Sequence, residues 1–429
     1  MTRLLVVYDA GAATPREIAA GLRTLGDVTF GVPASAATPR LLTIMAELGG
    51  VVTLEAGVAE QVRALAAQAP DAILTYSDRE LRHTAALAEG LGLLYHSVAT
   101  AELLTDKHRQ REALRAAGVD RVRSCPLTRP DELPAAIEAV GLPAVVKPRR
   151  GASSRNTFLV SEPEHGAALV RALLAPDGNE RGERELVVEE LLRGRDCAPY
   201  GDYVSVESLT RDGEVTHVAV SGKMPLAPPF REVGQFWPAA LSRPDRQAVE
   251  DLARGALRAL GVRVGVSHTE IKLTPDGPHI IEVNGRLGGT INELSLTAGG
   301  PDLIEAAGRL ALGLGPQPFA VPDDEVSYVL FNLAPTARCT LESVDGARQV
   351  RALPGVRTYR TLIRPGSTIE GGVHSEWLDL LYGRAADHAT MLARMDTALD
   401  TLRFTFGLPS GPVTVRARSL RQRWEDIAP

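Results

Sequence analysis

The sequence predicts a multidomain protein that combines α/β and α+β architecture, and three observations carry this prediction. The 429 residues are too many for one ordinary hydrophobic core, so two to four structural units are expected. The first hundred residues alternate short apolar runs with helical patterns, which is typical of a parallel α/β sheet. From about residue 105 the pattern becomes richer in strands and loses this regular alternation.

The N-terminal region justifies the α/β part of the prediction. Strands are expected at residues 4–8, 51–54, 72–75 and 93–95, and helices at residues 15–25, 58–68 and 79–90. No GxGxxG motif follows any of these strands, so a dinucleotide site is not indicated.

Composition and charge limit the partners. The net charge is −6 and the pI is near 5.9, which favours neither nucleic acid nor an anionic membrane as partner. The apolar run at residues 4–8 is too short for a signal sequence, and no apolar run of about 18 residues appears. The three cysteines are sparse and form no CxxC pair, which fits a reducing, cytoplasmic location.

Residues 267–286, SHTEIKLTPDGPHIIEVNGR, carry the clearest chemical signal. Two alternating segments flank Thr-Pro-Asp-Gly, which predicts a β-hairpin. With a three-residue loop at 275–277, Glu270 faces Glu282 and His268 faces Asn284. Both pairs then lie on one face, because strand side chains alternate with period two.

Two facing carboxylates repel each other unless a proton or a cation lies between them. Magnesium binds oxygen ligands and commonly uses one or two carboxylates together with substrate phosphates. Glu270, Glu282 and Asn284 therefore predict a Mg²⁺–nucleotide site. The alternative is a solvated hairpin whose glutamates pair with Lys272 or Arg286, and the apolar neighbours and the glycines at 285, 288 and 289 argue against it.

Two weaker signals precede the hairpin. Lys147 ends an apolar strand and is followed by a polar, glycine-containing loop at 149–156, whose backbone N–H groups could face phosphate oxygens. The apolar strand at 186–191 leads to acidic residues and Gly194, as expected of a hinge beside an adenine ring. Each pattern also fits an ordinary strand end or turn.

In order and spacing, these segments resemble the ATP-grasp superfamily over roughly residues 105–314. The spacing of Glu270, Glu282, Asn284 and Arg286 is similar to that of the biotin carboxylase branch. The local sequences around these residues, His-Thr-Glu at 268–270 and Asn-Gly-Arg-Leu-Gly-Gly at 284–289, resemble those of bacterial L-amino-acid ligases more closely.

The resemblance implies a role for each matching residue. Lys107 and Lys147 would contact the ATP phosphates, and Arg286 would stabilise an acyl-phosphate and a tetrahedral intermediate. Glu270, Glu282 and Asn284 would hold two Mg²⁺ ions, with Mn²⁺ as a possible substitute. The remaining nucleotide contacts are a mobile loop over the triphosphate (Gly151, Ala152, Ser153, Ser154), an adenine pocket (Glu189 to Leu192, with backbone contacts from Glu190 and Leu192) and a ribose ligand (Asp196, with Asp202 as its competitor).

Residues 221–238, SGKMPLAPPFREVGQFWP, resemble the substrate loop of amino-acid ligases. Lys223 would reach the phosphates, and Glu232 would bind an amino group. His268 would orient a carboxylate or act as a base. The alternative is that the aromatic residues of this stretch are core packing and its charges are solvated.

The resemblance thus implies an ADP-forming carboxylate–amine ligase acting on small-molecule, amino-acid-like substrates through an acyl-phosphate. A purine-pathway-like or carboxylase-type enzyme and a non-catalytic nucleotide-binding module are the alternatives, and a homodimer is possible. The expected units are a pre-ATP-grasp domain (1–104), the ATP-grasp core (105–314, with lobes at about 120–195 and 200–314) and a C-terminal α+β lobe (315–429).

Overall fold

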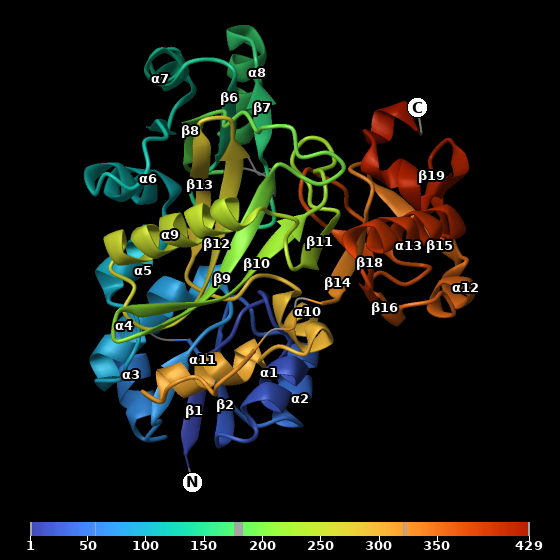
Figure 1. The fold of residues 1–429 in the computed structure, drawn as a ribbon. Helices are drawn as coiled ribbons and strands as arrows, with labels where there is room; N and C mark the ends of the chain where they lie inside the picture. Colours follow the sequence, from blue (N-terminus) through green and yellow to red (C-terminus); the bar gives the residue numbers. More distant parts are fainter. Residues whose placement is uncertain (1, 56, 176–182, 321, 323, 428–429) are drawn as a thin grey trace.

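The computed structural model describes residues 2–55, 57–175, 183–320, 322 and 324–427, and within them the strands form four sheets (Figure 1). The first sheet is parallel, and the three that follow are antiparallel. The mixed architecture predicted from the sequence is therefore confirmed.

The parallel N-terminal sheet has the strand order β3-β2-β1-β4. Its elements are β1 (Arg3–Val7), α1 (Pro15–Leu22), β2 (Asp27–Pro33), α2 (Pro39–Ala46), β3 (Gly50–Leu54), α3 (Val58–Ala66), β4 (Ala72–Leu74) and α4 (Leu81–Leu91). Helix α1 begins where expected because Thr14 and Glu17 form a capping box and Pro15 occupies the first turn.

Two details of this sheet differ from the sequence prediction. Strand β2 was not predicted, although it lies inside the sheet between β1 and β3. Residues 93–95 were predicted as a strand and form none, because helix α4 ends at the left-handed Gly92 and the chain then turns away. There the Tyr95 ring packs edge-on against His96, with the centroids 4.8 Å apart.

The second sheet, at the top of Figure 1, has the order β5-β8-β6-β7. Its strands are β5 (Ser124–Leu127), β6 (Ala144–Pro148), β7 (Phe158–Val160) and β8 (Leu186–Glu190), with helices α7 (Leu133–Val140) and α8 (Pro163–Leu173). Helices α5 (Val98–Thr105) and α6 (Lys107–Ala116) precede this sheet in the chain.

The third sheet is the largest and has the order β13-β12-β9-β10-β11-β14-β18-β16. Its strands are β9 (Tyr203–Arg211), β10 (Glu214–Lys223), β11 (Gly234–Trp237), β12 (Gly265–Thr274), β13 (Gly277–Asn284), β14 (Val326–Leu333), β16 (Val356–Thr361) and β18 (Trp377–Ala385). One face packs on helix α9 (Arg243–Ala259) through residues such as Val206, Ile271 and Leu257. Helix α11 (Leu303–Ala311) joins the sheet to the N-terminal domain, where Tyr76 Oη donates a 3.0 Å hydrogen bond to the Ile304 carbonyl.

The hairpin β12–β13 keeps the predicted partners but reaches them differently. His268 faces Asn284 and Glu270 faces Glu282, as expected. Nearer the turn, however, Thr274 pairs with Gly277, so the loop has two residues and the predicted three-residue loop is wrong. A β-bulge between these two regions inserts one extra residue on β13 and restores the register at the glutamates.

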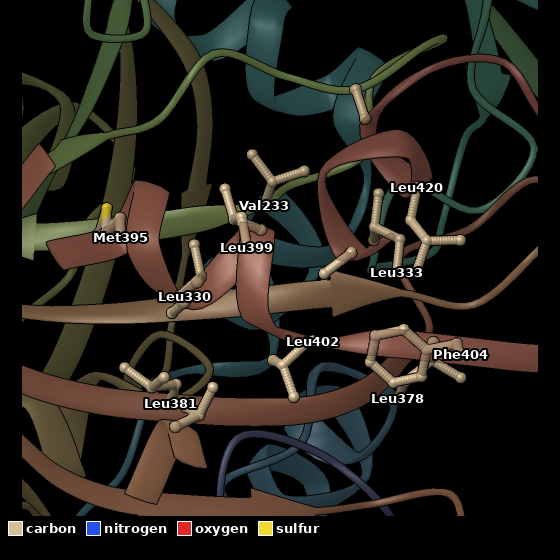
Figure 2. Packing of buried hydrophobic residues seen from close by; sticks show 14 of the residues in the cluster. Val233, Leu330, Leu333, Leu378, Leu381, Met395, Leu399, Leu402, Phe404 and Leu420 are labelled. Carbon is tan, nitrogen blue, oxygen red and sulfur yellow. The ribbon is translucent and has the colours of Figure 1, made fainter. Parts of the chain in front are cut away.

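The C-terminal region is built onto the large sheet rather than beside it. Strands β14 and β18 turn one face toward a core formed with α13 (His388–Thr401) and the fourth sheet, whose order is β17-β15-β19-β20. Figure 2 shows Leu330 and Leu381 of the large sheet gathered with Leu399, Leu402 and Phe404. The remaining elements are α10 (Ile291–Ala298), β15 (Cys339–Asp345), α12 (Ala347–Arg351), β17 (Thr368–Ile369), β19 (Arg403–Leu408) and β20 (Gly411–Arg416).

Asp379 of β18 makes the stability of this region depend on pH. The carboxylate is fully buried and receives 2.7 Å hydrogen bonds from Asn332 Nδ2 and Tyr359 Oη. Burial raises the pKa of Asp379 to about 7, and the hydrogen bonds offset this only in part. The folded chain thus holds the proton over a range in which the unfolded chain has lost it. The free energy of unfolding should therefore fall between about pH 4 and pH 7, by up to about 4 kcal/mol.

The variant Asp379→Asn should lack this fall, because an amide does not ionise. Thermal unfolding at pH 5 and pH 8 measures the effect, and the variant should gain stability relative to the wild type at the higher pH. Asp345→Asn, at an exposed position of the same region, is the control. Parallel pH profiles for the wild type and Asp379→Asn would show that Asp379 is not the group responsible.

Candidate active site

The predicted metal ligands lie together on the face of the large sheet opposite helix α9. Strand β12 carries His268 and Glu270, and β13 carries Glu282 and Asn284. On the neighbouring strand β9, Glu207 lies opposite His268 and Ser205 lies opposite Glu270. Asn284 is buried, and its Nδ2 donates a 3.4 Å hydrogen bond to the His268 carbonyl, so its amide oxygen is the atom that would serve as a ligand.

The donor set on this face fits magnesium. Two facing carboxylates and one amide oxygen are hard oxygen ligands, and magnesium commonly completes its shell with phosphates and water. Among the residues that the structure describes, no three His, Cys, Asp or Glu side chains gather to enclose a metal. The two carboxylates and the amide oxygen would form a partial shell, which is the arrangement expected of a metal shared with a nucleotide.

Lys107 lies directly against this donor set. It is the first residue of α6, and its Nζ lies 2.7 Å from Glu282 Oε1 and donates a 2.7 Å hydrogen bond to the Gly151 carbonyl. Burial by itself lowers the pKa of Lys107, but the Glu282 carboxylate outweighs this and leaves the pKa above its usual value. The side chain is therefore a fixed cation between the carboxylate pair and the predicted phosphate loop.

Lys147 lies one residue before the end of strand β6 and forms a buried ion-pair cluster with Glu189 of β8. Its Nζ lies 2.7 Å from Glu189 Oε2, and Arg111 of α6 contacts the same carboxylate with Nη2 at 3.0 Å. Burial would raise the pKa of Glu189, but Arg111 and Lys147 lower it to about 2. Burial lowers the pKa of Lys147, because Glu189 offsets the cost of burial only in part.

Arg111 was missed by the sequence analysis. It also donates a 2.7 Å hydrogen bond to the Ile281 carbonyl, at the bulge of the hairpin, so it joins the small sheet to the strand that carries two of the predicted metal ligands. The available signal was its spacing, because a residue four positions after Lys107 shares its helix face. The side chain of Glu189 is thus engaged in this cluster, and its place in an adenine pocket stays a prediction.

The loop after Lys147 is held on both sides. Ser153, Ser154 and Asn156 have left-handed backbone conformations, with φ of 58°, 53° and 51°. Two backbone hydrogen bonds dock the loop on a C-terminal segment, from Ser375 N to the Ser153 carbonyl (2.8 Å) and from Asn156 N to the Val373 carbonyl (2.9 Å). The predicted phosphate-loop residues Gly151, Ala152, Ser153 and Ser154 therefore lie between Lys107 and the C-terminal region.

The predicted adenine and ribose residues follow β8. The Glu190 side chain pairs with Arg123 at 3.1 Å and its backbone N–H bonds the Arg123 carbonyl, while Leu192 is partly buried in the connection that follows. The Asp196 carboxylate is exposed and accepts a 3.0 Å hydrogen bond from Ala198 N. Asp202 forms an ion pair with Lys272, in which Oδ1 lies 2.6 Å from Nζ. These assignments, and the competition between the two aspartates, stay predictions.

The buried Lys223 forms an ion pair with the partly exposed Glu232 beside the face that carries the predicted metal ligands. Lys223 Nζ lies 3.0 Å from Glu232 Oε1 and 2.9 Å from Gln235 Oε1. Burial by itself lowers the pKa of Lys223, but Glu232 and Glu270 outweigh it and raise the pKa. Within the same stretch Phe236 and Trp237 are fully buried, as the core-packing alternative expects, but Phe230 is only partly buried and the Lys223 charge is buried rather than solvated.

His268 is held by an acidic residue that the sequence analysis missed. Its Nδ1 lies 2.6 Å from Glu207 Oε1, and its Nε2 lies 3.5 Å from Glu270 Oε1. Burial lowers the pKa of His268, but Glu207 outweighs burial and raises the pKa to about 9. The pKa of Glu270 falls to about 2, because His268 and Lys223 overcome the effect of burial. Carboxylate binding and base catalysis by His268 both stay predictions.

Arg286 is held by the N-terminal domain. Its Nε donates a 2.9 Å hydrogen bond to Asp78 Oδ2, and Nη2 contacts the same oxygen. Asp78 lies just after β4, so the pre-ATP-grasp region contributes a carboxylate to the predicted site. Sequence reasoning could not find this pair, because 208 residues separate its members.

The fold and this constellation define the class of protein. Residues 140–293 match the ATP-grasp domain family, so the chain carries an ATP-grasp domain, as the sequence predicted. Proteins of this family generally use ATP and Mg²⁺.

The chain is similar to several particular proteins in sequence or in structure. The chain is 29% identical over 232 residues to an alanine–anticapsin ligase of Bacillus subtilis (strain 168), a match that covers 51% of this chain and 49% of that relative. An L-amino acid ligase from Bacillus licheniformis has a TM-score of 0.75 at 22% identity, over 94% of this chain and 98% of that one. The biotin carboxylase domain of a Hydrogenobacter thermophilus 2-oxoglutarate carboxylase, solved with MgADP and bicarbonate, has a TM-score of 0.69 at 18% identity, over 98% and 92%.

The sequence matches and the structural matches support different conclusions. The chain spans about half the length of the curated relatives that it matches, and the structural likenesses show the ATP-grasp fold. Among the described helices, none combines the length and the apolar character needed to span a bilayer.

Proposed function

We propose that the protein is an ATP-dependent carboxylate–amine ligase that joins amino-acid-like substrates and releases ADP and phosphate. One observation carries the proposal. The facing pair Glu270 and Glu282 lies against the fixed cation Lys107, inside an ATP-grasp domain. The names of the similar ligases support amino acids as the substrate class.

The proposed reaction has two steps. An oxygen of the acid substrate attacks the γ-phosphorus, the bond to the β,γ-bridging oxygen breaks, and ADP leaves. The amine nitrogen then attacks the acyl carbon of the acyl-phosphate, the carbon–oxygen bond to phosphate breaks, and the amine loses a proton. Negative charge gathers at the phosphoryl group in the first step and on the acyl oxygen in the second.

Each predicted site residue has a proposed role in this reaction. Lys107 and Lys147 would bind phosphate oxygens, and Arg286 would bind the acyl-phosphate. Glu270, Glu282 and Asn284 would hold two magnesium ions, which would neutralise charge on the phosphates. On the substrate side, the pair of Lys223 and Glu232 would meet the reacting phosphate and an amino group, and His268 would lie beside them.

The test is a pairwise screen of amino acids for ADP release in the presence of ATP and Mg²⁺. At least one acid–amine pair should release ADP and phosphate together with a condensed product, and Glu282→Ala should release none. Release of AMP and pyrophosphate would contradict an acyl-phosphate route.

The same screen separates the other candidates. ADP release that needs bicarbonate rather than an amine would favour a carboxylase-type enzyme. Magnesium-dependent thermal stabilisation by ATP without any turnover would favour a nucleotide-binding module. A cytoplasmic location and a homodimer remain part of the proposal on the sequence argument alone.

A further inference from the structure

Asp106 lies between the two elements that present the predicted phosphate-binding lysines. Its side chain is fully buried, and it is the N-cap of helix α6, where Oδ1 accepts a 3.1 Å hydrogen bond from Arg109 N. An N-cap fixes the first turn of a helix, and the first residue of this one is Lys107.

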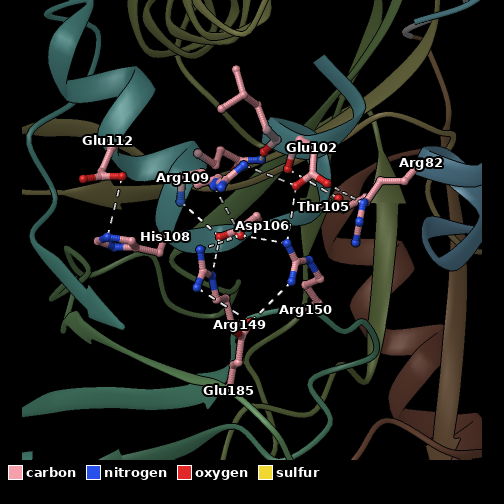
Figure 3. A network of polar contacts seen from close by, with 12 residues as sticks. Arg82, Glu102, Thr105, Asp106, His108, Arg109, Glu112, Arg149, Arg150 and Glu185 are labelled. Atoms are coloured by element: carbon pink, nitrogen blue, oxygen red, sulfur yellow. Dashed lines mark hydrogen bonds and ion pairs between the residues drawn. The ribbon is translucent and has the colours of Figure 1, made fainter. Parts of the chain in front are cut away.

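The same carboxylate also holds the chain that follows Lys147. Arg149 Nε donates to Asp106 Oδ1 at 2.8 Å and its Nη2 lies 2.8 Å from Oδ2, while Arg150 Nη2 lies 3.1 Å from Oδ2 (Figure 3). The two oxygens of one buried side chain thus bind a helix terminus and two successive arginines at the start of the phosphate loop.

The backbone repeats this connection. Lys107 N donates a 3.1 Å hydrogen bond to the Arg149 carbonyl, and Lys107 Nζ reaches the Gly151 carbonyl at 2.7 Å. A displacement of the helix start relative to residues 149–151 would therefore move Lys107 and the loop apart. Such a displacement would change their geometry toward a triphosphate and leave the adenosine contacts near β8 in place.

We propose that Asp106 is a positioning residue for nucleotide binding, which clamps the start of α6 to the phosphate loop so that Lys107 and the loop converge on the triphosphate. This inference rests on the nucleotide site of the proposed function. Burial would raise the pKa of Asp106, but its hydrogen bonds to Arg149 and to Arg109 N lower it, so the carboxylate stays ionised in this clamp.

The surrounding acids provide a matched control. Glu102 contacts Arg82, Arg109 and Arg150 at 2.7, 3.5 and 3.4 Å, but it caps no helix and does not contact Arg149 (Figure 3). Its side chain is partly exposed, whereas that of Asp106 is fully buried. Glu102→Gln removes one negative charge from the same cluster and leaves the contacts of Asp106 with Arg149 and with the start of α6 in place.

The experiment compares Asp106→Asn and Glu102→Gln with the wild type, using calorimetric titration with MgATP and with adenosine. Asparagine remains a good N-cap, so α6 should still form. MgATP should bind Asp106→Asn about tenfold more weakly, as is common when a supporting contact is lost. Adenosine affinity should not change, and Glu102→Gln should bind both ligands like the wild type.

The direction of the change in MgATP affinity distinguishes lost positioning from a simple change of charge. Removing a nearby negative charge should by itself strengthen the binding of an anion, so a weaker MgATP affinity must come from lost positioning. MgATP binding that is unchanged or tighter in Asp106→Asn would overturn the inference. Equal weakening of MgATP and adenosine would overturn it too, since a general loss of structure acts on both.

A second variant covers the case in which Asp106→Asn fails to fold. Arg149→Lys conserves the charge but cannot make the two-point contact with Asp106, so it should weaken MgATP and spare adenosine in the same way. A wild-type protein that does not bind MgATP would refute the proposed function itself. A wild-type protein that binds MgATP no better than both folded variants would refute only the role of Asp106.

Discussion

Replacing Glu282 with glutamine is expected to lower ADP release by at least about a hundredfold and to abolish the magnesium-dependent stabilisation by ATP. Glutamine keeps the shape of the side chain but not its charge, so the pair across the hairpin can no longer share a cation. Lys107, which lies 2.7 Å from Glu282, also loses its ion-pair partner. The measurements are ADP release and the melting temperature with ATP, each against magnesium concentration.

Asp276→Asn is the matched control for this variant. Asp276 lies in the turn of the same hairpin, but its side chain faces solvent, with 58% of it exposed. This control should respond to magnesium like the wild type. A Glu282→Gln protein that keeps wild-type activity and magnesium dependence would remove the metal site from the mechanism.

Replacing Arg286 with methionine should have an effect of similar size on turnover but a much smaller one on nucleotide affinity. A planar guanidinium is suited to a developing oxyanion, and the loss of such a donor commonly costs about two to three orders of magnitude in rate. Lys107 and Lys147 remain in place, so MgATP should still bind. ADP release and titration with MgATP measure the two effects separately.

Asp78 provides the control for Arg286→Met. In that variant the Asp78 carboxylate loses its partner in a largely buried place, which can cost about 3 kcal/mol or more. Adding Asp78→Asn should recover stability, measured by thermal unfolding, without recovering turnover. Recovery of both would mean that the arginine acts through folding rather than on the reacting groups.

The hairpin shows how far sequence reasoning reaches. Alternation of side chains identified one face, and the facing glutamates were predicted with the correct partners. The loop length was wrong, and a bulge compensated for it, because sequence patterns fix which residues share a face but not where an extra residue is inserted. The class of fold was predictable because strand and helix periodicity are local properties of the chain.

The site residues that the sequence did not predict have in common that their partners lie far away in the sequence. Glu207, Arg111 and Asp78 each stabilise a predicted site residue from a distant part of the chain. Ion pairs between such residues depend on how strands and helices far apart in the sequence are brought together, and no local spacing records them. The prediction of a strand at residues 93–95 failed for a related reason, since an apolar triplet becomes a strand only where the chain brings it alongside a sheet.

The shared eight-stranded sheet limits how this protein could be rebuilt. Strand β14 pairs with β11, whose Gln235 contacts Lys223. A fragment ending before β14 would expose the backbone of β11 along an open edge, which invites aggregation. Chimeras that exchange C-terminal regions with related proteins should therefore be joined beyond β18, because an earlier junction would also replace the strand that pairs with β11.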